Sequence, residues 1–567
     1  MALFLRSSRA LFGAAFVGIL TSACYSAGGG SDPPLKSLYF PVGMAVSPDG
    51  QWLVVVNSDF DLQYNGGTLQ TYDLQGIRHD ALYAIASAEE AGTCWSQPTP
   101  TANGILGLAC AHPADAAAGT YWADPSQYWH DGVIVGAFAT DLLQLSLPWW
   151  QVPPSVTTTR LLAPIRGTTA VLYADLNLAQ GHLNCLGRNG NRCGGGSNVG
   201  SDPSLLHDTR QVVLSGEPFG IAQTSDGTAF VVTSESDTTT SVFTSGVSVP
   251  EAPDGGIDTV GEGIDLSPGP ALQYVLGGLP AAGTGIAEIP HDPAAWTTCG
   301  IPASFNCWRP AFLETNHSTA EIDLLRYYSD DDTGDDPAGG YRPFLQREGV
   351  FALTATTGSD ERGIVIDDSA RSICHAQTPA MLLACGDPTV VDQAGCISQV
   401  HSQDVACGWL PANVYVATRT PPALLLGQVG DPYNPDDLSI QGTIPLPAGP
   451  SKVYRAPIID AQGNFQVRIF VACFDANLVI VYDPATQLWD SIPVGSGPFA
   501  MAFDPFPTDR WGMPPDSSQP AYRFGYVASF TQSFIEVLDL DNSQNNVPST
   551  FESIAYAIGQ PTLPKGQ

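Results

Sequence analysis

The alternation of apolar and polar residues predicts short β-strands joined by tight turns. The clearest unit has one strand at 41–46, a second at 52–57 and a third at 68–73. Asp49 and Gly50 stand between the first two strands and supply the left-handed residues that a tight hairpin requires. The first five residues of the middle strand are all apolar, so we expect both of its faces to be buried between neighbouring sheets.

The same order of strands and turns returns along the chain. It is clearest in four segments, residues 41–74, 216–244, 449–483 and 495–541. A lone sheet of three or four strands cannot bury both faces, whereas sheets stacked around an axis cover one another. We therefore predict an all-β protein whose single domain, residues 35–567, is a β-propeller of seven blades, with eight blades as the alternative. Its disulfides are expected in loop insertions between the strands.

These units resemble the propeller repeats of the YVTN and lactonase-like families. The resemblance lies in Pro218-Phe-Gly-Ile-Ala222, the Asp226-Gly227 turn, the apolar strand that follows it, and a third strand ending in an aspartate, as at Asp73. It is poor across 75–215 and 283–440. The resemblance implies a rigid ring around a central channel. From the lactonase-like members it also implies a hydrolytic or metal-dependent site at the channel mouth.

Long helices have few places to form, because the chain contains 58 glycines and 47 prolines. A helical apolar period is found only briefly, at 319–328. A closed ring needs one blade that uses both ends of the chain. The candidates for this shared blade are the apolar runs 551–558 and 36–40.

The first residues predict export. Arg6 and Arg9 precede an apolar run at 11–20, which is too short to span a bilayer and is typical of a secretory signal peptide, residues 1–23. The sequence Leu-Thr-Ser-Ala-Cys ending at Cys24 resembles the bacterial lipobox, which implies that Cys24 carries the lipid. The alternative is an ordinary signal peptide with a chance cysteine.

Residues 24–34 are rich in Gly, Ser and Pro and are expected to form a flexible tether. Tyr25 follows Cys24, and by resemblance to the sorting pattern of Gram-negative bacteria this favours an outer-membrane lipoprotein. No other stretch is apolar enough to span a membrane. The acyl chains on Cys24 are therefore the only membrane attachment that we predict.

Ten cysteines fall into neighbouring pairs in loop-like sequence. The pairs are Cys94 with Cys110, Cys185 with Cys193, Cys299 with Cys307, Cys374 with Cys385, and Cys396 with Cys407. We predict five local disulfides, in keeping with an exported protein. The last four cysteines are equally spaced and could instead pair as Cys374 with Cys407 and Cys385 with Cys396. Cys473 lies in an apolar strand and is expected to be a buried free thiol.

Charge excludes one class of partner. The chain has 22 Lys and Arg against 56 Asp and Glu, a formal net charge of −34. Such a surface repels polyanions, so nucleic-acid binding is not expected. We expect a monomer whose partner is a protein or a glycan of the cell envelope.

One acidic loop is a candidate calcium site. It carries five carboxylates within seven positions, from Asp330, Asp331, Asp332, Asp335 and Asp336. Calcium prefers such hard oxygen ligands. The spacing does not match the twelve-residue calcium loop, and the alternative is a solvated acidic loop without a cofactor.

The remaining chemistry favours binding over catalysis. Nine histidines are scattered and form no metal-binding motif, although His291 and the segment from Glu314 to His317 would be the first residues to test for activity. Trp149 and Trp150 lie in an insertion and could contact a protein or glycan partner. We therefore predict a non-catalytic binding or scaffolding lipoprotein. The alternative is a lactonase-like or metal-dependent hydrolase with its site in the channel.

Overall fold

The structure is a computed structural model. It describes residues 31–91, 122–146, 156–185, 191–193, 210–225, 227–247, 266, 268–290, 310–329, 343–353, 359–387, 389–407, 410–429, 438–459, 465–504, 524–540 and 553–559.

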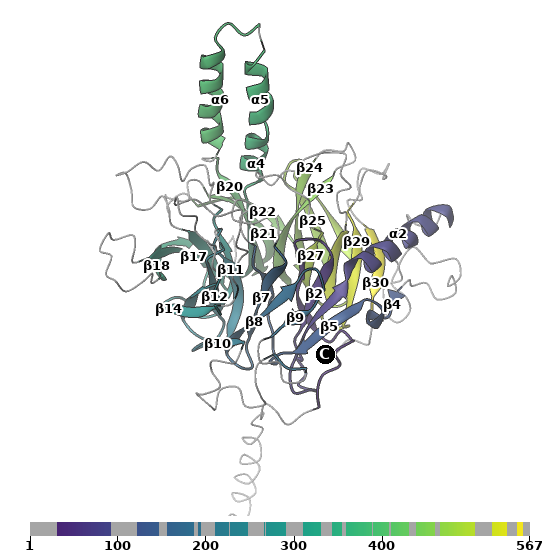
Figure 1. Ribbon diagram of the computed structural model, residues 1–567. Coiled ribbons are helices and arrows are strands. Elements are labelled where there is room, and N and C mark those ends of the chain that lie inside the picture. The colour runs from purple at the N-terminus through teal and green to yellow at the C-terminus, as the bar shows by residue number, and fades with distance from the viewer. Residues whose placement is uncertain are drawn as a thin grey trace, which may run out of the picture.

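The chain forms a seven-bladed β-propeller, as predicted (Figure 1). Each blade is an antiparallel sheet of four main strands, and blades 1 to 7 follow the order of the chain. The first strands of successive blades contact one another around the ring, so they surround the central channel. The interval between 41 and 218 holds two blades, and the whole ring has seven blades, not eight.

The strands are given by their position in blades 1 to 7. The first strands are β1 Pro41–Val46, β6 Leu143–Gln144, β11 Pro218–Gln223, β15 Gly283–Glu288, β19 Ser359–Asp367, β23 Pro450–Ile459 and β27 Pro498–Phe503. The second strands are β2 Trp52–Asn57, β7 Thr158–Ile165, β12 Ala229–Ser234, β16 Ala311–Asn316, β20 Ala412–Thr420, β24 Phe465–Cys473 and β28 Phe524–Ser529. The third strands are β3 Thr68–Asp73, β8 Ala170–Asn177, β13 Thr239–Thr244, β17 Glu321–Ser329, β21 Pro422–Val429, β25 Leu478–Asp483 and β29 Phe534–Asp539. The fourth strands are β5 Trp129–Ile134, β10 Gln211–Val213, β14 Ala271–Gly277, β18 Pro343–Ala352, β22 Ser439–Pro445, β26 Leu488–Pro493 and β30 Ser553–Ile558.

The apolar core lies between the blades. Among the described residues there are seven clusters of buried apolar side chains, one at each interface between neighbouring blades. Strand β2 shows how the sequence produces them, because Leu53 and Val55 face blade 7 while Val54 and Val56 face blade 2. This confirms that an apolar strand without alternation is buried on both faces.

Glycines in the first strands allow neighbouring blades to approach closely. A Cβ atom on Gly220 would lie 2.6 Å from the Thr284 carbonyl oxygen, and one on Gly285 would lie 2.3 Å from that of Arg362. Gly43 and Gly363 have the same close contacts with the next blade. The glycine of the Pro-Phe-Gly-Ile-Ala pattern is therefore required by packing between blades.

Replacing one of these glycines should destabilise the ring. We expect Gly285→Ala to lower the free energy of unfolding by about 3 kcal/mol, because the backbone of the next blade must move. Gly349→Ala is the matched control, since its nearest neighbour would be the Leu324 Cβ at an ordinary 3.6 Å. Denaturant unfolding of both variants checks this, and equal stabilities would contradict the packing role of Gly285.

The closure of the ring differs from the prediction. The run at 551–558 does supply the fourth strand of blade 7, β30, but residues 36–40 form no strand. Instead the short strand β4, Trp122–Ala123, pairs in parallel with β30. Helix α2, Leu74–Ala91, also packs on blade 7, and the Arg78 guanidinium of α2 forms a buried ion pair with Asp504 of that blade. The insertion after β3 thus joins blades 1 and 7.

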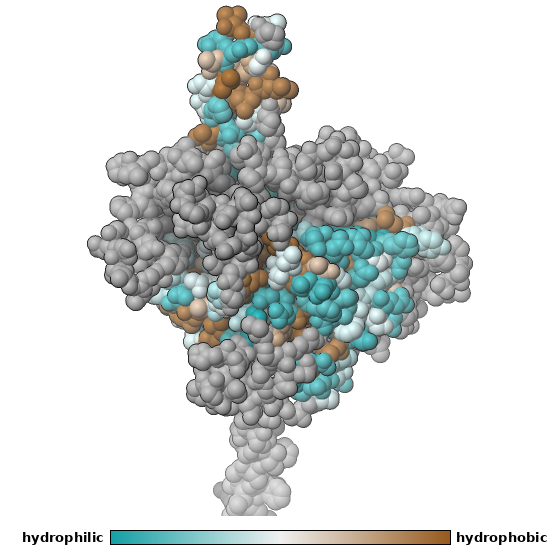
Figure 2. All heavy atoms as spheres, viewed as in Figure 1, coloured by the Kyte–Doolittle hydropathy of each residue, from teal (hydrophilic) through white to brown (hydrophobic). Residues whose placement is uncertain are grey.

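Helices are more extensive than the glycine and proline content suggested. Besides α2, the connection from β19 to β20 contains α4 Ser369–Ala376, α5 Thr378–Cys385 and α6 Gln393–Cys407. Helices α5 and α6 form a hairpin that projects from the propeller, and apolar residues are exposed on it (Figures 1 and 2). The apolar period at 319–328 belongs to a strand, β17, whose residues are buried on both faces and so do not alternate.

Two disulfides in the helical hairpin differ from the predicted pairing. Cys374 pairs with Cys407, and Cys385 pairs with Cys396. Pairing by proximity in sequence was therefore wrong for these four cysteines, and the alternative pairing is the one found. Helix α4 packs against α6 and places Cys374 beside Cys407 at the base of the hairpin, and the antiparallel α5 and α6 bring Cys385 beside Cys396 near its tip.

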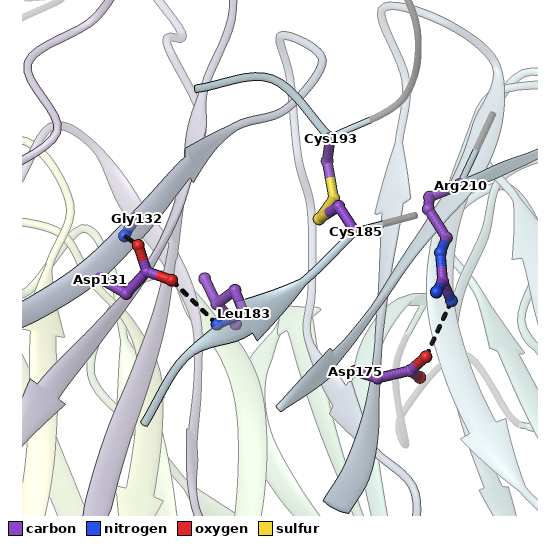
Figure 3. Close-up of a disulfide and its surroundings, with 7 residues drawn as sticks. All are labelled: Asp131, Gly132, Asp175, Leu183, Cys185, Cys193 and Arg210. Atoms are coloured by element: carbon purple, nitrogen blue, oxygen red, sulfur yellow. Dashed lines mark hydrogen bonds and ion pairs between the residues drawn. A yellow bond between two sulfur atoms is a disulfide. The ribbon is translucent and has the colours of Figure 1, made fainter. Parts of the chain in front are cut away.

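The third disulfide joins Cys185 and Cys193 in the insertion of blade 2, as predicted (Figure 3). Nearby, the carboxylate of Asp131 in β5 accepts hydrogen bonds from the backbone N–H groups of Gly132 and Leu183. Leu183 belongs to the short strand β9, Leu183–Asn184, so Asp131 ties the insertion of blade 2 to blade 1. Cys473 is a buried free thiol, as predicted, and burial raises its pKa to about 12.

Two of the five predicted disulfides fall on cysteines outside the described residues. Cys94 and Cys110 both lie outside the described residues, in the insertion that follows α2. Cys299 and Cys307 also lie outside the described residues, between β15 and β16. The disulfide of Cys94 with Cys110 and that of Cys299 with Cys307 therefore stay predictions from the sequence.

Other predicted sites also lie outside the described residues. They are the lipidation site Cys24, the acidic residues Asp330, Asp331, Asp332, Asp335 and Asp336, and Trp149 and Trp150. Ser31 and Asp32, at the end of the predicted tether, contact the propeller, since Ser31 forms a β-bridge with Tyr64 and Asp32 pairs with Arg192. Within the described part of the chain, no helix is both long and apolar enough to cross a membrane.

Candidate functional site

A cavity of about 440 Å³ lies in the central channel. Residues near the beginnings of the first strands line it, for example Phe219 of β11 and Phe499 of β27. The ends of second strands also contribute, as with Arg419 of β20 and Phe474 just after β24. Antiparallel neighbours begin and end at the same edge of a sheet, so all of these residues lie at one end of the channel. We call this end the entrance.

One side of the entrance is aromatic. Phe474 and Phe499 line the cavity, and the ring centroid of each lies 5.9 Å from that of Phe530. The ring centroid of Phe530 also lies 4.9 Å from that of Phe40 and 5.5 Å from that of Phe60. The Phe60 side chain is half exposed. We call these five residues the aromatic arc. Of the five, Phe474 and Phe499 line the cavity and offer ring surface to an apolar group entering it.

Three cations face the same cavity, and each is paired with a carboxylate. Lys452 Nζ lies 2.8 Å from Asp141 Oδ1, and Arg419 Nη2 lies 2.6 Å from Asp475 Oδ2. Arg362 Nε lies 2.5 Å from Asp360 Oδ1. The cavity lining itself holds three cations and two carboxylates, since Asp360 is not part of it. Because Asp360 neutralises Arg362 from outside the lining, each of the three cations has one carboxylate partner.

Lys452 crosses the channel. It stands in β23 of blade 6, whereas Asp141 lies two residues before β6 of blade 2, and these blades are not neighbours in the ring. Its ammonium group also donates to the Thr140 carbonyl oxygen at 3.3 Å and lies 4.8 Å from the centre of the Phe499 ring. The Lys452 side chain is 13% exposed, so its charge is largely enclosed.

Of the residues named from the sequence for possible activity, His291 lies outside the described residues, and Glu314, Asn316 and His317 lie away from the cavity. Glu314 is buried between blades 3 and 4, where its Oε2 accepts a hydrogen bond from Thr240 Oγ1 at 2.7 Å. Asn316 donates to the Glu321 carbonyl oxygen, and His317 Nε2 lies 3.9 Å from Glu235 Oε1. None of the three lines the cavity. Among the described residues, no group of three or more His, Cys, Asp or Glu is placed to hold a metal ion.

Sequence reasoning missed the three cations of the cavity. One signal was present for Lys452, because it occupies the position in β23 that Gly43 and Gly285 occupy in β1 and β15. Arg362 and Arg419 belong to a region where the repeat resemblance is poor. Their convergence depends on the closure of the ring, which no local motif reports.

No family model matches the chain, and no curated protein matches it. Solved structures are similar at low identity. Hydrazine synthase of Kuenenia stuttgartiensis is 10% identical over 91% of this chain and 99% of that chain, with a TM-score of 0.41. A putative 6-phosphogluconolactonase of Bacteroides fragilis is 11% identical over 81% and 86%, with a TM-score of 0.38. Apo AztD of Citrobacter koseri is 11% identical over 70% and 83%, with a TM-score of 0.32. All three TM-scores are below 0.5, so these similarities carry no argument about what this chain does.

Proposed function

We propose that this protein is a binding protein whose channel cavity holds a small organic acid, a carboxylate attached to a compact aromatic group. The observation that carries the proposal is the convergence of Arg362, Arg419 and Lys452 on a cavity that also contains Phe474 and Phe499. Small-molecule sites are commonly concave and mostly apolar, with a few charged groups that orient the ligand. A volume of about 440 Å³ suits such a ligand.

The charge of the protein makes this convergence informative. The chain has only 22 Lys and Arg against 56 Asp and Glu, yet three of the cations meet in one cavity. A partly buried cation attracts an anion more strongly than one on the surface, because water screens it less. Phe474 and Phe499, which line the cavity beside these cations, would cover the apolar part of the ligand.

The carboxylates of the cavity support binding over hydrolysis. Asp141 and Asp475, the carboxylates in the lining, each lie in an ion pair with a cation. To take a proton from a substrate, either carboxylate would first have to leave its ion pair. The alternative, a lactonase-like hydrolase, needs acid–base or metal-binding groups that converge on a substrate.

Other predictions from the sequence remain predictions. They are the lipid on Cys24, the outer-membrane location, the monomeric state, and a protein or glycan partner. The proposed cavity ligand does not depend on any of them.

Isothermal titration with phenylacetate tests the proposal, with the neutral phenylacetamide as the matched ligand. We expect phenylacetate to bind and the amide to bind at least about tenfold more weakly, because a charge-assisted hydrogen bond is lost. Arg362→Met should weaken phenylacetate binding by a similar factor. Arg192→Met is the control, since Arg192 pairs with Asp32 and does not line the cavity. Equal binding of acid and amide, or no binding of either, would overturn the proposal.

A further inference from the structure

We infer that Lys452 is the residue that recognises the acidic group of the ligand, and that Asp141 is a built-in competitor which the ligand displaces. This inference rests on the proposed binding of an organic acid in the channel. It adds a specificity-determining residue and an autoinhibitory contact to that site.

The contacts of Lys452 indicate a group that requires an anion. Its side chain is largely enclosed, and its ammonium group contacts one carboxylate, one carbonyl oxygen and one aromatic face. An enclosed ammonium group loses much of its hydration, so removing its anionic partner without replacement is unfavourable. A ligand carboxylate placed beside Phe499 could make the same ion pair.

Asp141 can be released more readily than Lys452. Its side chain is 30% exposed, and its Oδ1 accepts a hydrogen bond from the adjacent Leu142 N–H. A carboxylate that leaves the pair can therefore become hydrated at the entrance. Exchange of Asp141 for a ligand carboxylate preserves the ion pair of Lys452 and releases one carboxylate to water.

The other two ion pairs of the site are less suited to this role. Arg362 and Asp360 are only two residues apart, so their contact is local in sequence. Asp475 is 53% exposed, which places the pair of Arg419 at a wetter position. Of the three pairs around the cavity, that of Lys452 and Asp141 alone joins blades that are not neighbours.

The competition has a measurable consequence. Where a binding-competent state is only a fraction of the population, the apparent affinity is reduced by that fraction. With Asp141 on Lys452, ligand acids bind only after the pair opens. Removing the charge of Asp141 should therefore tighten the binding of acids, whereas removing the charge of Lys452 should weaken it.

Titration of phenylacetate into four proteins tests the inference: the full chain, Asp141→Asn, Lys452→Met and the double variant. We expect Asp141→Asn to tighten binding at least fivefold and Lys452→Met to weaken it at least tenfold. The double variant should bind like Lys452→Met, because Asp141 competes only through Lys452. Asp141→Ser provides a second form of the released state should the asparagine variant fold poorly.

Glu217→Gln controls for the change in net charge. Glu217 forms a partly exposed ion pair with Arg166 and does not line the cavity, so its variant should bind phenylacetate like the unmodified chain. If Asp141→Asn binds the acid no more tightly than the unmodified chain, or if Glu217→Gln tightens binding equally, the inference is wrong. Failure of the proposed function is distinguishable, because then neither the unmodified chain nor Asp141→Asn binds the acid.

Discussion

The free energy of unfolding should fall as the pH rises from about 5 to 8, because two glutamates are buried as neutral acids. Burial raises the pKa of Glu314 from 4.5 to about 8, and burial also raises the pKa of Glu361 from 4.5 to about 8. Glu361 is fully buried, and neither of its carboxylate oxygens has a hydrogen-bond partner within the described part of the chain. The nearby carboxylates of Asp360 and Glu321 raise its pKa further.

The sign follows from where the protons are held. Between pH 4.5 and 8 the folded protein keeps protons on Glu314 and Glu361 that the unfolded chain has already released. The folded state therefore binds more protons, and its stability decreases with pH across this window. The stabilising contribution is complete below pH 4.5 and is lost as the pH passes 8. For each glutamate, the difference between the pKa of the unfolded chain and that of the folded protein corresponds to up to about 5 kcal/mol in the free energy of unfolding.

Denaturant unfolding at several pH values between 5 and 9 checks this expectation. In Glu361→Gln, an uncharged amide replaces the acid, so the decline with pH should be shallower than in the unmodified chain. Glu314→Gln should act likewise, since the amide oxygen can still accept from Thr240. Glu217→Gln, at a partly exposed ion pair, should leave the slope unchanged. A slope equal in Glu361→Gln and the unmodified chain would show that Glu361 does not titrate in this window.

The second large effect is expected for Arg78→Met, which breaks the buried ion pair between α2 and blade 7. Arg78 Nη2 lies 2.7 Å from Asp504 Oδ1, and the two side chains are 7% and 1% exposed. Arg78 Nη1 also donates to the Gly50 carbonyl oxygen at 2.6 Å. Removing one partner of a buried pair leaves an uncompensated charge, and typically lowers stability by about 3–5 kcal/mol.

Denaturant unfolding of Arg78→Met measures this loss, and the exposed pair provides the control. Arg192→Met removes a partner of the exposed Asp32, so we expect a change of less than about 1 kcal/mol. The double variant Arg78→Met/Asp504→Asn should recover part of the stability, because the buried charge is also removed. Similar stabilities of Arg78→Met and Arg192→Met would contradict the proposed role of α2 in closing the ring.

The propeller could be predicted because its signals are local. An Asp-Gly turn between two apolar strands, as at Asp49-Gly50, depends on residues next to one another in the chain, and its repetition indicates stacked sheets. The apolar residues on both faces of β2 likewise predicted that this strand is buried between two neighbouring sheets. Cys473 was recognised as buried by the same reasoning.

Helical and paired features were harder to predict. Cys374 and Cys407 are 33 residues apart, and their pairing depends on the antiparallel packing of the hairpin rather than on spacing. The helix-like period of β17 was misleading, because a strand buried on both faces need not alternate. The ring is closed through β4 and α2, which belong to an insertion in blade 1. The residues of blade 7 that this insertion contacts are more than 400 positions later in the sequence.

The chain alone therefore specifies repeated strands, their buried faces and the number of blades to within one. The cavity depends on tertiary structure. Its residues range from Asp141 to Phe499, and most of the blades contribute only a few of them. Lys452 and Asp141 are brought together only when seven sheets close around an axis. Local strand propensity depends on neighbours in sequence, whereas the chemistry of a channel depends on side chains that meet across it.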